Sequence, residues 1–143
     1  MVYVYVYVMA VAGVSADELV ARGRRAAESL MTDVVLVSRA DGPPVTDPES
    51  GVVAAPSLVV YEGIGRVQGR ATEAKTVDGV QVYILSDLTV QLPVSVEPVV
   101  DDEVRVVESL TEPHLVGRTF RVKSAPRKSH ATMTRCEAEE VAA

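Results

Sequence analysis

The sequence is poor in aromatic residues. Its 143 residues include no Trp, one Phe and five Tyr, although 48% of them are hydrophobic. Valine supplies most of the apolar side chains. Because valine is stiff about χ1 and fits the pleated surface of a sheet, this composition favours β-structure. A chain of this length fits one domain with a core of its own, and we expect residues 1–143 to form a single domain.

Cysteine is scarce as well, and the common catalytic motifs are missing. The one cysteine, Cys136, excludes an internal disulfide framework, and with His114 and His130 it makes no CxxC or HxxxH spacing for a metal. There is no GxSxG, no GxxxxGK[ST] and no glycine-rich dinucleotide loop. The acidic run Asp101, Asp102 and Glu103 is typical of a solvated turn. We therefore expect no metal, no cofactor and no enzymatic activity.

Positive charge is rare outside one segment. The net charge is −6, with 13 acids against 4 bases in residues 41–112, whereas residues 113–135 hold 6 bases and no acid. A nucleic-acid-binding domain is usually basic overall and stacks bases on exposed aromatic rings. The basic segment offers only Phe120, whose alternation with Arg121 and Lys123 predicts that it points inward. A monomeric β-barrel that binds nucleic acid through this segment remains the alternative from a different class.

The first 14 residues are apolar but too short to cross a membrane. The apolar run over residues 2–14 is about 13 residues, and a span needs about 20, so no membrane partner is expected. Valine alternates with Tyr3, Tyr5 and Tyr7, which predicts a strand or arm. Because such a strand would aggregate if exposed, we expect it to pair with a sheet edge of its own chain or of an adjacent subunit. The alternative is that the chain truly starts at Met9.

Residues 15–31 are the one predicted helix. Ser15 and Glu18 have the spacing of a capping box. An apolar stripe at helical spacing follows, formed by Leu19, Val20, Gly23, Ala26, Ala27, Leu30 and Met31. The other face carries Arg22, Arg24 and Arg25. These arginines form either a solvated face, supported by a Glu18–Arg22 pair, or a contact with an acidic partner surface.

Short strands with turns between them are predicted for the rest of the chain. The strands cover residues 33–39, 58–68, 80–92, 101–109, 118–125 and 131–141. Residues 40–57 read as a loop or long hairpin end, and residues 69–79 as a polar loop. Gly63 and Gly65 suggest a bulge or tight bend. The fold class is therefore mainly β, with a small barrel or sandwich of about six to seven strands over residues 33–141 after one N-terminal helix.

Several segments in order resemble a known family. They are ARGRRAAESLMTD, VTDPESGVV, VYEGIGRVQ, LPVSV and VGRTFRVKSAPRKSHATMTR. They are similar to small structural proteins of tailed actinobacteriophages, in the wider head-closure or head-to-tail stopper group. The resemblance implies a virion protein of the phage neck, made in the host cytoplasm. It also implies a homo-oligomeric ring, a hexamer. This ring lies between a portal-bound adaptor and the tail terminator or tail tube. Double-stranded DNA passes through the ring without sequence-specific contacts.

The resemblance also implies a loop that projects into the channel and interfaces between subunits. By position the gate loop falls on Gly69, Arg70, Glu73, Lys75, Asp78 and Gly79, with residues 40–57 as the other candidate. The candidate subunit interface comprises Tyr3, Tyr5, Tyr7, Arg22, Arg24, Arg25, Arg121 and Lys123. Within the same machine, a tail terminator or an adaptor is the alternative assignment.

Overall fold

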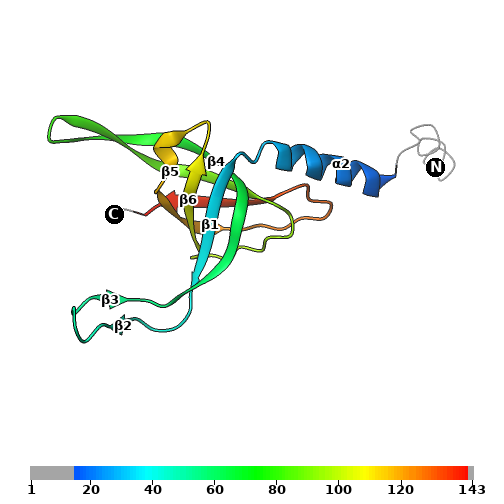
Figure 1. Cartoon of the computed structure of the whole chain (residues 1–143). Coiled ribbons are helices and arrows are strands. Elements are labelled where there is room, and N and C mark those ends of the chain that lie inside the picture. The colour runs from blue at the N-terminus through cyan, green and yellow to red at the C-terminus, as the bar shows by residue number, and fades with distance from the viewer. Residues whose placement is uncertain (1–14, 142–143) are drawn as a thin grey trace.

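A computed structural model describes residues 15–141, without the side chains of residues 70–75, 77 and 81–87. Six antiparallel strands close into a barrel in the order β1-β4-β5-β8-β7-β6 (Figure 1). They are β1 (Asp33–Ala40), β4 (Ser57–Val77), β5 (Val80–Leu92), β6 (Glu103–Ser109), β7 (Thr119–Ser124) and β8 (Thr134–Glu140). A helix, α2 (Ala16–Ser29), precedes them. The predicted fold class, a small β-barrel with one N-terminal helix, is confirmed.

The barrel interior is filled by aliphatic side chains from alternate strand positions. Val35 and Val37 of β1, Val104 and Val106 of β6 and Val122 of β7 are all fully buried. Phe120 is the largest fully buried residue, and Leu88, Leu92 and Cys136 lie in the same cluster. Arg121 and Lys123 of β7 are exposed, as the alternation predicts. The core therefore uses small branched side chains, which suit the narrow interior of a six-stranded barrel.

The helix begins as predicted but covers little of the barrel. The Ser15 hydroxyl accepts a hydrogen bond from the Glu18 N–H at 3.3 Å, which satisfies one of the unpaired donors of the first turn. Of the predicted apolar stripe, only Ala27 and Met31 are buried, whereas Leu19 is 57% and Leu30 is 56% exposed. Figure 1 shows α2 extending away from the barrel. Most of its apolar face is therefore not used in the folded monomer.

The prediction of a loop over residues 69–79 is wrong. Residues 69–77 continue β4, which pairs with β5 as far as Val77↔Val80, and only Asp78 and Gly79 form the turn. Both turn residues have positive φ, 50° and 79°, as a two-residue hairpin turn requires, and Asp-Gly is a preferred sequence for it. The predicted hairpin end at residues 40–57 is confirmed, with β2 (Val45–Thr46) pairing with β3 (Val53–Ala54).

The glycines of β4 do not mark the bulge that was expected there. The register between β1 and β4 shifts between Val37↔Tyr61 and Ser38↔Val59, so the extra residue is Val60. Gly65 instead allows a close approach, because a Cβ there would lie 3.0 Å from a Val35 methyl and 3.3 Å from the Gln91 carbonyl oxygen. The absence of a side chain at Gly65 therefore lets β1 and β5 pack against β4 at this point.

An ion pair between a partly exposed arginine and a buried carboxylate holds the end of β1 to the segment before β6. Asp102, 1% exposed, accepts two hydrogen bonds from Arg39, at 2.8 Å from Nε and 2.9 Å from Nη2. It also accepts one from the Val99 N–H at 2.9 Å. These hydrogen bonds raise the pKa of Arg39. The prediction that the acidic run is a solvated turn is therefore wrong for Asp102, because its carboxylate is fully paired inside the structure.

We expect Arg39→Ala to lower the free energy of unfolding by about 2 kcal/mol, because Asp102 keeps only its backbone donor while it stays buried. The free energy of unfolding of Arg39→Lys should lie between those of wild type and Arg39→Ala, since lysine keeps the charge but cannot make two parallel hydrogen bonds. Urea unfolding followed by circular dichroism measures the difference. Equal stability of Arg39→Ala and wild type would mean that the pair contributes nothing.

Cys136 is an inert core thiol in this structure. Burial, with a smaller contribution from the charge of Asp102, raises its pKa from 9.0 to about 12. The unfolded chain therefore loses the thiol proton first, and stability should fall as pH rises from 9 towards 12. Unfolding at pH 8 and pH 10 measures this slope, with Cys136→Ala as the control that should lose it. The native thiol should also resist a disulfide reagent at pH 8 until the protein unfolds.

Candidate interaction surfaces

The β4–β5 hairpin continues beyond the barrel wall as a two-stranded ribbon. β1 pairs with β4 only as far as Gly65, and β8 pairs with β5 only from Leu88 onward. In the described pairing, the outer edges of residues 66–77 and 80–87 therefore have no partner strand. Figure 1 shows the ribbon leaving the barrel on the side away from α2. An unpaired edge carries backbone donors and acceptors that another strand can satisfy.

The root of this ribbon is capped by a buried aspartate. Asp33 is 4% exposed, and its Oδ2 accepts a hydrogen bond from the Val67 N–H at 3.1 Å. Its Oδ1 accepts one from the Ser109 hydroxyl at 2.6 Å. Asp33, the first residue of β1, therefore satisfies the Val67 N–H at the point beyond which β4 continues without β1 as a neighbour. The sequence contained no sign of this role, because the three residues lie far apart along the chain.

The candidate gate residues all lie on this ribbon. Gly69, Arg70, Glu73 and Lys75 are β4 residues paired with β5, and Asp78 and Gly79 form its tip. The candidate gate residues thus form a paired hairpin where a polar loop was predicted, and they lie on an element that projects from the barrel (Figure 1).

The β2–β3 hairpin forms a second projection, which we call the acidic arm (residues 41–56). It contains Asp41, Asp47 and Glu49 and no Lys or Arg. The Asp47 carboxylate accepts hydrogen bonds from the Glu49 N–H and the Ser50 hydroxyl, both at 2.9 Å, and these lower its pKa. The loop is therefore held in shape by local hydrogen bonds. Three valines of the arm are strongly exposed: Val45 at 61%, Val52 at 59% and Val53 at 64%.

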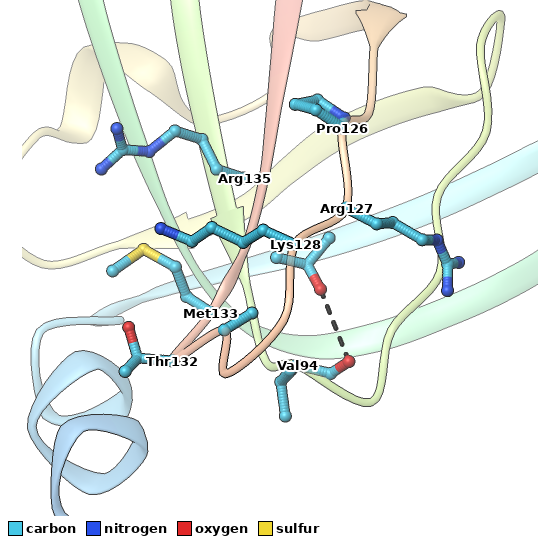
Figure 2. A pocket seen from close by; sticks show the side chains of 9 residues that line it. Val94, Pro126, Arg127, Lys128, Thr132, Met133 and Arg135 are labelled. Carbon is cyan, nitrogen blue, oxygen red and sulfur yellow. Dashed lines mark hydrogen bonds between the residues drawn. The ribbon is translucent and has the colours of Figure 1, made fainter. Parts of the chain in front are cut away.

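A hollow on the opposite side of the barrel carries positive charge. The segment between β7 and β8 lines a cavity of about 340 Å³ beside α2, which we call the basic groove. It is lined by Val94, Pro126, Arg127, Lys128, Ala131, Thr132, Met133, Thr134 and Arg135. Figure 2 shows Lys128 and Arg135 extending to the same side, with Met133 next to them. Apolar and cationic side chains therefore share one surface.

The cations of the basic groove differ in how they are paired. Arg127 Nη1 lies 2.9 Å from Glu97 Oε1. Among the residues that the structure describes, Lys128 and Arg135 have no ion-pair partner. Two exposed, unpaired cations on one surface attract an anionic group more strongly than either alone.

Of the predicted interface residues, the arginines of α2 lie closest to the basic groove. Arg24 Nε donates a hydrogen bond to the Ala131 carbonyl at 3.2 Å, while Arg22 and Arg25 are exposed. Next to it, Gly23 faces Thr132, whose methyl carbon would lie 2.6 Å from a Cβ at position 23. The helix is therefore fixed to the β7–β8 segment at its middle.

The other predicted interface residues are elsewhere. Arg121 lies on the barrel wall opposite Glu103 on one side and Glu139 on the other, so it has acidic neighbours within the same sheet. Lys123 is exposed on the same strand. Tyr3, Tyr5 and Tyr7 lie outside the described residues. The basic groove and the exposed valines of the acidic arm were not predicted from the sequence. Two signals were available: residues 113–135 contain six bases, and residues 41–56 contain no Lys or Arg.

Across residues 15–141, no group of three or more His, Cys, Asp or Glu side chains lies close enough to hold a metal ion. None of the helices described there is long and apolar enough to cross a membrane.

A double-mutant cycle tests the contact between α2 and the basic groove. Gly→Ala usually stabilises a helix by about 1 kcal/mol. Gly23→Ala should instead destabilise the protein, since Thr132 blocks the new methyl group. In a Thr132→Ala background the same substitution should stabilise it, and thermal unfolding of the four proteins measures the sign change. Stabilisation by Gly23→Ala in both backgrounds would show that α2 does not rest on this segment.

Comparison with known proteins places the chain in one family. No curated protein and no solved structure matches the chain. Residues 23–139 match DUF6093, a family of unknown function. The match takes in all six barrel strands, except the last residue of β8, together with the acidic arm and the basic groove. Since it spans most of the sequence, this chain belongs to the family DUF6093.

Proposed function

We propose that this protein is a non-enzymatic structural subunit of a tailed-phage virion, a head-to-tail stopper that assembles into a homo-oligomeric ring in the neck. The single observation that carries the proposal is the contrast between a closed barrel and its projections. Strand pairing inside the barrel leaves it without an edge strand for a neighbour. The acidic arm and α2 instead expose valines and leucines that the monomer does not bury.

Both projections carry apolar side chains that could be buried by a neighbouring subunit. Val52 and Val53 of the acidic arm and Leu19 and Leu30 of α2 are each more than half exposed. A monomeric protein gains nothing from apolar side chains held out on projections, whereas an assembling subunit buries them. The exposed valines of the acidic arm lie on or next to a hairpin whose strands have two residues each.

The ribbon and the charge distribution are consistent with a channel for DNA. The ribbon extends from the barrel as a paired element that can reach into a central opening (Figure 1). The net charge of −6 disfavours tight binding of DNA phosphates, so DNA would pass without being held along its length. The competing proposal of a monomeric nucleic-acid-binding barrel receives less support. Phe120 lies in the core, and Tyr61 is partly buried with its hydroxyl bonded to the Ile64 carbonyl.

Mass photometry of the purified full chain tests the proposal, together with negative-stain images of the same sample. We expect a ring of about six copies that dissociates on dilution, and the chain should be found in the neck of purified virions. Short duplex DNA should bind weakly at physiological salt. The proposal would be contradicted if the protein stayed monomeric at every concentration and was also missing from purified virions. Tight binding of DNA by the monomer would contradict it as well.

A further inference from the structure

The acidic arm and the basic groove have complementary charge and matching apolar exposure, and they lie on different sides of the barrel. The arm carries three acidic residues and no base, with exposed valines. The groove carries Lys128 and Arg135, which have no ion-pair partner among the described side chains, beside Val94, Pro126 and Met133. From these observations we propose that the acidic arm of one subunit docks into the basic groove of a second copy of this chain.

A second copy is the occupant because the arm and groove of one chain are kept apart. Figure 1 shows the arm projecting from one side of the barrel while α2 and the adjacent β7–β8 segment lie on the other. The contact therefore joins two different surfaces of two identical chains. Such a head-to-tail contact repeats around a ring when the rotation closes. The inference rests on the proposed function, because it names the contact by which the ring assembles.

The arm is built to present its side chains rather than to bury them. Its loop is closed by bonds among its own residues: the Asp47 N–H donates to the Val52 carbonyl at 2.9 Å, and the Gly51 N–H to the Asp47 carbonyl at 2.8 Å. Val52, Val53 and Glu49 are all exposed in this loop. A preformed hairpin loses less conformational entropy when it docks than a flexible loop would.

The groove is likewise shaped before a partner arrives. The Thr134 hydroxyl donates to the Val96 carbonyl at 3.1 Å, and the Arg127–Glu97 pair joins the β7–β8 segment to the β5–β6 connection. From the α2 side, Arg24 bonds the Ala131 carbonyl. Lys128 and Arg135 line this groove, and Figure 2 shows their side chains extending to the same side. Carboxylates of an incoming arm meet these two cations, and its valines meet Met133 and Pro126.

Charge reversal tests the pairing in the full chain. Asp41→Lys with Glu49→Lys should raise the dissociation constant of the oligomer by up to about 25-fold, since two pairs are lost and each is worth up to about fivefold. Lys128→Glu with Arg135→Glu should do the same. A chain that carries all four substitutions should assemble again, because the contact re-forms with reversed polarity. As a control, Glu108→Lys with Glu112→Lys changes the charge equally at exposed sites on and just beyond β6 and should leave assembly unchanged.

Cross-linking tests the geometry. A chain with Glu49→Cys and Lys128→Cys should form a ladder of disulfide-linked multimers under mild oxidation, while each single variant should give no more than linked dimers. The native Cys136 is buried and does not compete. Rings that assemble without the ladder, and that resist the charge reversals, would overturn the arm–groove contact while the proposed ring function stands. A protein that stays monomeric at all concentrations would overturn both the arm–groove contact and the ring function. Protection of the groove by a short duplex oligonucleotide, in place of a second subunit, would identify a DNA site and overturn the inference.

Discussion

Closure of the barrel is the constraint on which the rest of this structure depends. β1 pairs with β4 on one side and with β6 on the other. The β1–β6 pairing closes the barrel, so none of the six barrel strands is left as an edge strand. The Arg39–Asp102 pair ties this closure to the segment that enters β6. Once the strands are paired with each other, any further contact must come from elements outside the wall.

In the described part of the chain, three elements extend outside the wall, and each exposes groups that another chain could bind. The ribbon carries unpaired backbone edges, the acidic arm carries exposed valines beside carboxylates, and α2 carries exposed leucines beside arginines. The basic groove lies where α2 meets the β7–β8 segment. Charges of opposite sign are therefore separated on different sides of one molecule, which favours contacts between copies over contacts within one chain.

Much of the barrel could be predicted from the sequence because its strands bury one face. The alternation of Phe120 and Val122 with Arg121 and Lys123 was enough to assign both the strand and its inward face, and the structure agrees. The ribbon was missed because residues 69–77 are mostly polar, so no buried face imposes a period of two on them. The Asp78-Gly79 turn was the remaining local signal of a hairpin.

The paired and charged sites could not be predicted because their partners are distant in sequence. Asp102 meets Arg39 and Asp33 meets Val67 only after the barrel closes, and nothing local distinguishes these carboxylates from solvated ones. The six bases of residues 113–135 were visible, but their position beside α2 was not. The role of Tyr3, Tyr5 and Tyr7 stays a prediction, because these residues lie outside the described part of the chain.

Hydrogen–deuterium exchange measured at high and low protein concentration tests the central claim most directly. Backbone amides of the six barrel strands should be protected to the same degree at both concentrations, because the barrel is complete in each single chain. Amides of the acidic arm, and of the segment between β7 and β8, should become protected only at the concentration where the chain assembles. Protection that never changes with concentration, or that appears first in the barrel strands, would contradict an account in which a closed barrel assembles through its projections.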